Sequence, residues 1–579
     1  MTRTDSFVVG ALVVLFAILA GLVGAPALTP ATTAVVPSAS PDPIITRPYR
    51  EGVLGRPVSI SPLTARTQAD RDLVALIFCG LVKNGPAGTL LPDLAESWTV
   101  DPTGAAWTFK LREDARWHDG EPVTAMDVEF TIRTLQDPEY AGPAAGSWND
   151  AAVEVVDPRT IAITLENPLG GFLQAATQPI APAHLLAGVP VGELAEHPFG
   201  RQPVGSGPFA LVRLDEDSAE LAPAAIVRPS EAAESVVGPT ASTVDSLATP
   251  APTARPTGAN PYLPGIEFRY YDDPDALAAA YRAGALDAAS GLPPSVAGEL
   301  VATPGSRVLR YPGSTLTAVL FNLRADRHVF TTPAIRTAFL AAIDRPALIE
   351  AAFAHAAGSA NGPIPPTSPL FDPSAAPPVA FSRDAAQKAL KEAGWKKSEN
   401  AWRRASDTKP LTFELLSPDA ESNPGLFAAA AAVAADWKYI GIQVSHVPLP
   451  PGEFVTDRLA TADFTVAVAD VTIGLDPDLY PLMASSQTLT GGSNVIGLQD
   501  PALDALLLAA RKPASTVDRA AAYGALQVQL AKGMYLLPLA FADKPIVVRD
   551  TLQGPRLRQV ADRSDRFWDV LTWRLAADR

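Results

Sequence analysis

The chain has 579 residues, 47% of them hydrophobic and 19% charged, which is enough for several hydrophobic cores. Its 46 basic and 62 acidic residues give a net charge of −16, which argues against nucleic acid and anionic lipid as partners. The single cysteine, Cys79, excludes an intramolecular disulfide and a thiolate metal cluster.

An uncharged apolar run occupies residues 7–25. Its length lies between that of a signal-peptide core and the ~20 residues of a membrane span, and Ala25-Pro26-Ala27 matches a cleavage motif. We expect residues 1–30 to be an N-terminal membrane anchor or, as the alternative, a cleaved signal segment. Residues 31–47 lack periodicity and predict a flexible tether. The bulk of the chain is therefore expected outside the cytoplasm, anchored at the cell membrane or, after cleavage, secreted.

The stretch AWTFKLREDARWHDGEPVTAMDVEFTIR, residues 106–133, combines a strand, a turn and a helix. Apolar and polar residues alternate at its start, as in a half-buried strand, and Thr124 with Asp127 predicts a capping box at the helix start. His118 and Asp119 lie on the turn between the two elements. Adjacent residues on a tight turn rarely converge on one substrate atom, so we interpret this pair as structural rather than catalytic.

A low-complexity segment rich in Ala, Thr, Pro and Ser occupies residues 231–260 and predicts a disordered insertion, because it cannot bury enough apolar surface to fold alone. Beyond it, strand-like and helix-like segments alternate. Examples are the strand at 411–417, the Ala-rich helix at 426–441, the strand at 442–449 and the helix at 516–533. This order favours an α/β domain with a largely parallel sheet.

Four motifs follow one another along the chain: LLPDLAESWTVDPTGAAWTFKLREDARWHDGEPVTAMDVEFTIRTLQDP, then PVGSGPF, then FNLRADRHVFTTPAIRTAFLAAIDRPALI, and finally QKALKEAGW. In these motifs and in their order the chain resembles the family 5 extracellular solute-binding proteins, the peptide-, oligosaccharide- and nickel-binding subunits of ABC importers. The resemblance covers about residues 52–575, interrupted by the insertion.

The resemblance implies an α/β, two-lobed fold like that of periplasmic binding proteins, with a hinge and an extra small domain. The sheet of each lobe is expected to be mixed and largely parallel. Lobe I would comprise residues 48–84, 203–312 and 538–579, the extra domain residues 85–202, and lobe II residues 313–537. Such a protein is not an enzyme and needs no cofactor. A monomer would bind its solute between the lobes and deliver it to an ABC transporter permease.

The resemblance also places candidate solute-binding residues. Peptide-binding members hold the peptide ammonium with an aspartate in a loop after a strand of lobe II. A gap-free alignment puts Ala469, Asp470, Val471, Thr472 and Ile473 in that loop, with Ile473 in the place of the acid. A buried ammonium opposite Ile473 would lose a charge-assisted bond unless Asp470 replaces the acid from a shifted position. The simpler expectation is a solute with an uncharged end, such as a blocked peptide or an oligosaccharide.

Four further candidates come from other segments. Arg66, Thr67 and Gln68 match the segment of lobe I that faces the solute. Trp148 is a candidate aromatic of the extra domain, although a core or surface position without a role in binding is the simpler interpretation of a single tryptophan.

Other chemistry finds little support in the sequence. The six histidines are scattered without metal-ligand spacing, and no P-loop or G-x-S-x-G motif is present. Two alternatives to transport stay open. One is a degenerate binding module that acts in sensing or scaffolding. The other is an extracytoplasmic hydrolase, which would need a nucleophile–base pair or paired carboxylates that no local motif supplies.

Overall fold

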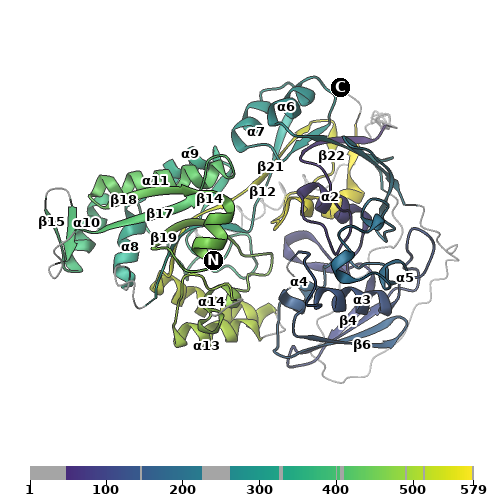
Figure 1. Ribbon diagram of the computed structural model, residues 1–579, viewed down its shortest axis with the longest axis horizontal. Helices are drawn as coiled ribbons and strands as arrows, with labels where there is room; N and C mark the ends of the chain where they lie inside the picture. The colour runs from purple at the N-terminus through teal and green to yellow at the C-terminus, as the bar shows by residue number, and fades with distance from the viewer. Residues whose placement is uncertain are drawn as a thin grey trace, which may run out of the picture. The chain divides into compact units, whose positions relative to one another are not determined.

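A computed structural model describes residues 47–143, 146–224, 261–324, 330, 332–398, 401–404, 410–488, 492–512 and 516–576. The expected membrane segment, the expected tether except its last residue, and the expected insertion at 231–260 lie outside these ranges. The described residues belong to a single compact unit, built on three larger sheets (Figure 1). None of the helices in the described ranges is long and apolar enough to cross a membrane.

The largest sheet has seven strands in the order β12-β21-β11-β1-β10-β9-β8. Its strands are β1 (Tyr49–Leu54), β8 (Phe209–Leu214), β9 (Ser218–Pro223), β10 (Ile266–Tyr271), β11 (Ala288–Ser290), β12 (Ser306–Tyr311) and β21 (Lys544–Arg549). β1 runs parallel to β10 and β11, and the remaining neighbours are antiparallel. Three helices contact strands of this sheet: α2 (Gln68–Ile77), α6 (Pro274–Arg282) and α7 (Pro294–Leu300).

A four-stranded antiparallel sheet has the order β4-β5-β7-β6. Its strands are β4 (Ala95–Val100), β5 (Ala106–Leu111), β6 (Ala151–Asp157) and β7 (Thr160–Leu165). β5 alternates strictly between exposed and buried residues, as its sequence predicts. The helix α3 (Ala125–Leu135) follows, and the predicted capping box is present: the Asp127 carboxylate accepts hydrogen bonds from the Thr124 amide at 2.7 Å and from its hydroxyl at 3.1 Å.

The third sheet has six strands in the order β14-β20-β13-β19-β17-β18. They are β13 (Thr315–Phe321), β14 (Ala357–Ser359), β17 (Thr412–Pro418), β18 (Gln443–Leu449), β19 (Val466–Thr472) and β20 (Leu536–Ala542). The helix α11 (Pro424–Ile440) crosses over between the parallel strands β17 and β18, as the alternation of strand and helix predicts. Separate hydrophobic clusters lie against the sheet, one containing Trp437 of α11 and the other containing Leu526 and Leu530 of α14 (Thr516–Gly533).

The seven-stranded and six-stranded sheets are mixed, as expected, but they are not largely parallel. Parallel pairings are two of the six described in the seven-stranded sheet and two of the five in the six-stranded sheet. A parallel pair needs a long crossover connection, whereas strands that arrive from distant parts of the sequence are free to run antiparallel. β20 and β21 are such strands, and they pair antiparallel with all their neighbours.

The remaining elements are short or peripheral. The other helices are α4 (Phe172–Ala175), α5 (Ala183–Leu186), α8 (Pro333–Ala341), α9 (Arg345–Phe353), α10 (Arg383–Glu392), α12 (Tyr480–Met483) and α13 (Pro501–Arg511). The remaining strands pair in twos: β2 (Val82–Asn84) with β3 (Leu90–Pro92), β15 (Trp395–Ser398) with β16 (Ala401–Arg404), and β22 (Leu552–Gln553) with β23 (Arg574–Leu575). A 3₁₀ segment, η8 (Arg563–Thr572), packs against α2.

The chain passes twice between the seven-stranded and six-stranded sheets, once from β12 to β13 and once from β20 to β21. The two passages lie side by side, because a Cβ atom on Gly313 would clash with the carbonyl oxygen of Ala542. Val560 pairs with the first passage: it accepts a hydrogen bond from the Ser314 amide at 3.0 Å and donates one to the Pro312 carbonyl at 2.9 Å. We call residues 312–314, 542–544 and 560 the sheet junction. β20 belongs wholly to the six-stranded sheet, so the expected boundary after residue 537 falls inside a strand and the second passage lies at residue 543.

Candidate functional site

His118 fastens the turn before α3 to the loop at residues 205–207. Its ring Nδ1 accepts a hydrogen bond from the Gly205 amide at 3.3 Å, and its Nε2 lies 3.0 Å from the Gly207 carbonyl oxygen. This pattern requires a neutral ring with its hydrogen on Nε2, and burial lowers the pKa of the imidazole. Asp119 instead meets Nε2 of His184 at 2.9 Å. The two neighbours have different partners, and the structural interpretation of the pair is confirmed.

The described residues contain one serine–histidine pair of the kind a hydrolase would need. The Ser417 hydroxyl lies 2.8 Å from Nε2 of His446, but it also donates a hydrogen bond to the Pro418 carbonyl. Ser417 is fully buried, and no described carboxylate forms a hydrogen bond with His446 that would orient it as a base. Burial likewise raises the pKa of the Cys79 thiol, which makes it a poor nucleophile.

The candidates at the start of α2 mainly shape the helix end. The Thr67 side chain accepts a hydrogen bond from the Asp70 amide at 3.0 Å, and the Asp70 carboxylate accepts from the amides of Arg66 and Thr67. This is a capping box with aspartate at its third position. The Arg66 side chain is exposed and donates to the carbonyl of Ala141. Thr67 is thus committed to the helix, while Arg66 reaches toward solvent.

Gln68 connects α2 to the C-terminal part of the chain. Its side-chain amide donates to Asp72 at 2.9 Å and to Asp562 at 2.8 Å. Asp562 also pairs with Arg71 at 2.8 Å and caps η8 through its bond to the Ser564 amide. Gln68 therefore lies beside a segment far away in the sequence, and no local pattern around residue 68 could have predicted this neighbour.

Residues 469–473 alternate in direction along β19 and just beyond it. Ala469 and Ile473 are each 5% exposed and belong to a hydrophobic cluster of the six-stranded sheet, and Val471 packs against the same cluster. Asp470 and Thr472 are exposed. The sequence predicted that Ile473 lines the solute-facing wall. In the structure Ile473 is buried instead, because the two-residue period of a strand turns it toward the core. The acid that reaches solvent in this segment is Asp470.

Asp470 is held in place from the neighbouring strand and faces the sheet junction. The buried Thr317 hydroxyl donates to its Oδ1 at 2.7 Å. Part of the Asp470 side chain reaches solvent, yet protein surrounds the carboxyl closely enough to raise its pKa, an effect opposed by Thr317 and by the charge of Lys544. Burial lowers the pKa of Lys544 and Arg563 lowers it further, whereas Asp470 and Asp562 oppose this shift.

The charge of Lys544 links the two sets of candidates. It interacts with Asp470 of the six-stranded sheet and with Asp562, the hydrogen-bond partner of Gln68. The sequence prediction named Gln68 and Asp470 but missed Lys544, Asp562 and Arg563. Neither a motif nor a periodicity marks these three residues, because they come near one another and near Gln68 only when the C-terminal segment packs against β1 and α2.

Trp148 lies in the interior of the part of the chain that carries the four-stranded sheet. It is 3% exposed and makes an edge-to-face contact with Phe172, with ring centroids 4.9 Å apart. Its carbonyl accepts a hydrogen bond from the Gln136 side chain at 2.6 Å. The ring is thus a core side chain in this structure and presents no face to a solute.

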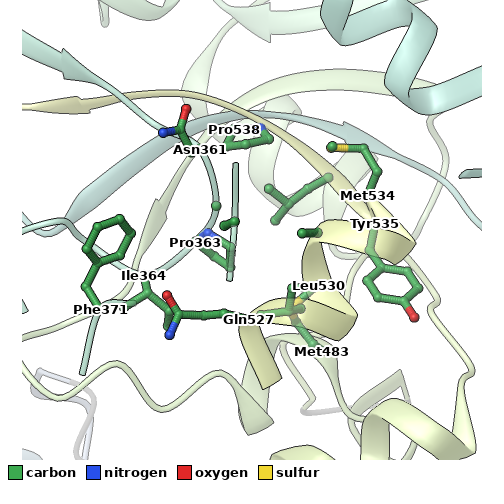
Figure 2. A pocket seen from close by; sticks show the side chains of 14 residues that line it. Asn361, Pro363, Ile364, Phe371, Met483, Gln527, Leu530, Met534, Tyr535 and Pro538 are labelled. Carbon is green, nitrogen blue, oxygen red and sulfur yellow. The ribbon is translucent and has the colours of Figure 1, made fainter. Parts of the chain in front are cut away.

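An apolar pocket lies apart from these candidates, between α14 and the loop after β14. It encloses about 430 Å³, including open solvent at its mouth. Figure 2 shows Leu530, Met534 and Met483 on one side, with Pro363 and Ile364 opposite them. None of the candidate residues named from the sequence lines this pocket. Methionine side chains adapt to irregular shapes, so the pocket suits a small apolar group rather than a charged one.

Within the described ranges, no group of three or more His, Cys, Asp or Glu side chains is placed to hold a metal ion.

Residues 89–493 match the family model described as "Bacterial extracellular solute-binding proteins, family 5 Middle". The chain belongs to family 5 of the bacterial extracellular solute-binding proteins. It is accordingly an extracytoplasmic binding protein and not an enzyme.

Individual relatives agree with this membership over most of their lengths. Protein XP55 of Streptomyces lividans is 30% identical over 508 residues, which cover 87% of this chain and 85% of the relative. The structure of the oligopeptide-binding protein AppA of Bacillus subtilis, solved with a nonapeptide, superposes with a TM-score of 0.68 at 20% identity and covers 92% of this chain and 100% of its own. The ABC transporter substrate-binding protein CtaP of Listeria monocytogenes gives a TM-score of 0.71 at 20% identity, covering 91% of this chain and 99% of its own. These two solved structures share its α/β fold.

Proposed function

We propose that this family 5 protein is the solute-binding subunit of an ABC importer and that it binds a peptide-like solute at the sheet junction. The observation that carries the proposal is that candidates from both sides share Lys544: Asp470 is exposed and fixed by Thr317, and Gln68 bonds to Asp562. Both Asp470 and Asp562 act on the charge of Lys544. The oligopeptide-binding protein AppA, solved with a nonapeptide, supports a peptide-like solute, and the ABC transporter substrate-binding protein CtaP supports an ABC transporter. No described feature favours an oligosaccharide over a peptide.

In this proposal the seven-stranded and six-stranded sheets are the centres of two lobes, and the four-stranded sheet forms the extra domain. The two passages through the junction act as the hinge, and closure of the lobes buries the solute. Gly313 is suited to such a role because it allows the passages to run in contact.

The solute is best matched by a peptide whose amino end is blocked. Asp470 is the one exposed acid on the β19 segment, but it already faces the positive charge of Lys544. A free ammonium placed there would gain one attraction and suffer the repulsion of Lys544, and of Arg563 beyond it. A blocked amino end, which carries no charge, avoids that repulsion.

Native mass spectrometry of the protein purified without denaturation tests the proposal directly. We expect a bound species with the mass and fragmentation pattern of a peptide, and we expect calorimetry to give tighter binding for N-acetylated tetrapeptides than for their free-amine forms. Tight binding of free-amine peptides that is lost in Asp470→Asn would show that Asp470 is an ammonium anchor. An oligosaccharide in the purified protein would refute the peptide assignment.

A further inference from the structure

Two cations meet at the sheet junction. Lys544 is the first residue of β21, directly after the second passage between the sheets, and Arg563 opens η8. Both side chains are partly exposed. An ideal Cβ atom on Gly291 would lie 3.2 Å from the Arg563 guanidinium, and one on Gly313 would lie 3.7 Å from Cε of Lys544, so each side chain passes closely over a glycine. Gly291 follows β11 and Gly313 follows β12, the two strands that flank β21, so both side chains lie at the same edge of the seven-stranded sheet. The charge of Arg563 accordingly acts on Lys544.

Neither cation has a direct partner among the residues that the structure describes: no ion pair and no side-chain hydrogen bond involves Lys544 or Arg563. Their neighbours differ. Arg71 pairs with Asp562 at 2.8 Å, and Arg566 pairs with two buried carboxylates. The acids nearby are therefore already used by other groups, and Asp470 is held by Thr317.

Such an arrangement is unfavourable without an anion. Burial is the largest influence on the pKa of both side chains and lowers each of them. The charges of Asp470 and Asp562 oppose the shift at Lys544, and those of Asp72 and Asp562 oppose it at Arg563, but the pKa of each group stays lowered. Two like charges in one place add repulsion. An anion bound between them would remove both costs and would be favoured over a neutral group of the same shape.

We propose that a carboxylate of the solute binds between Lys544 and Arg563. The inference rests on the proposed function, since it assigns a chemical group to the same junction. A carboxylate fits better than a phosphate, because the charges of Asp470, Asp562 and Asp72 act on the pair and would repel a second negative charge more strongly than a single one. For a peptide-like solute, the carboxylate is either the C-terminus or an Asp or Glu side chain.

Calorimetry on matched peptides separates these two sources. The probes are an N-acetylated tetrapeptide as the free acid, the same peptide as its C-terminal amide, and the amide with one Glu and with Gln in its place. We expect one of the acid forms to bind about 10-fold to 100-fold more tightly than its neutral counterpart. Lys544→Gln and Arg563→Gln should each remove most of that advantage. The control Lys388→Gln, on the exposed face of α10, should keep it.

Equal affinities of acid and neutral peptides for the unchanged protein would overturn the carboxylate site while leaving the peptide proposal intact. A failure of every peptide to bind would instead refute the peptide proposal, and a second probe then decides the site on its own. Millimolar succinate, compared with succinamide at equal ionic strength, should raise the thermal unfolding midpoint of the unchanged protein and of Lys388→Gln, but not of Lys544→Gln. An equal response to succinate in all three proteins would overturn the inference.

Discussion

Replacement of Arg566 by methionine should destabilise the protein strongly. The Arg566 side chain is 1% exposed and donates to Glu51 at 2.7 Å and to both carboxylate oxygens of Asp72, at 2.7 and 2.8 Å. Glu51 and Asp72 are themselves buried. Methionine would fill the space but remove the ion pairs of both carboxylates, and the loss of one partner of a buried ion pair costs about 3–5 kcal/mol. That loss is a large part of the ~5–15 kcal/mol that stabilises a typical domain.

Urea unfolding measures the effect. Trp573 packs against Tyr49 and Phe567, so its fluorescence reports on this region, although the other tryptophans contribute to the signal. Arg213→Met is a matched control: Arg213 forms ion pairs on the surface, and its replacement should leave the unfolding midpoint nearly unchanged. Adding Glu51→Gln and Asp72→Asn to Arg566→Met should restore most of the loss, because no uncompensated charge then stays buried.

The dependence on pH gives the same experiment a second readout. Burial raises the pKa of Glu51, and the charge of Arg566 opposes that shift, so the replacement of Arg566 should raise the pKa further. A carboxyl whose pKa is higher in the folded state than in the unfolded state stabilises the fold increasingly as the pH falls toward its unfolded value. The deficit of Arg566→Met should therefore shrink between pH 7 and about pH 5. A deficit below about 1 kcal/mol at pH 7, or one that grows on acidification, would refute the reasoning.

Four further changes test other features. Thr124→Ala should lower the free energy of unfolding by about 1 kcal/mol through the weakened capping box, as measured by urea unfolding. His118→Ala should leave solute affinity nearly unchanged in calorimetry, but it should lower the thermal midpoint because the loop at 205–207 loses two hydrogen bonds. The pKa of His118 is lowered in the folded state, so its contribution to the free energy of unfolding is complete above pH ~6.5 and declines as the pH falls below that value. In His118→Ala the free energy of unfolding should lack this decline. Ile473→Asp should destabilise the protein by several kcal/mol, since it buries a carboxylate in an apolar cluster, and an unchanged unfolding midpoint would contradict the burial of Ile473. Gly313→Ala should lower the thermal midpoint, because its Cβ would clash with a backbone carbonyl of the other passage, and an equally stable variant would show that the passages are not in contact.

The local elements of this protein follow from short-range patterns in its sequence. The alternation in β5 and the capping box of Thr124 and Asp127 need only neighbours within a few residues, and both are present as predicted. The order of motifs along the chain was enough to indicate the family, and through it the α/β fold. The same local view was sufficient to treat His118 and Asp119 as structural.

Tertiary structure alone decided which residues meet. The strands β20 and β21 enter the two larger sheets from a distant part of the sequence, so their direction was not encoded in the local alternation of strands and helices. The sequence placed Ile473 on the solute-facing wall, but the register of β19 decided that Ile473 faces the core and that Asp470 faces solvent. Arg566 bonds to Glu51, which lies 515 residues away in the sequence. Lys544 and Arg563 come near each other only after the chain has crossed twice between the two sheets. Charges and hydrogen bonds act over a few ångströms in space, whereas sequence patterns report only on neighbours along the chain.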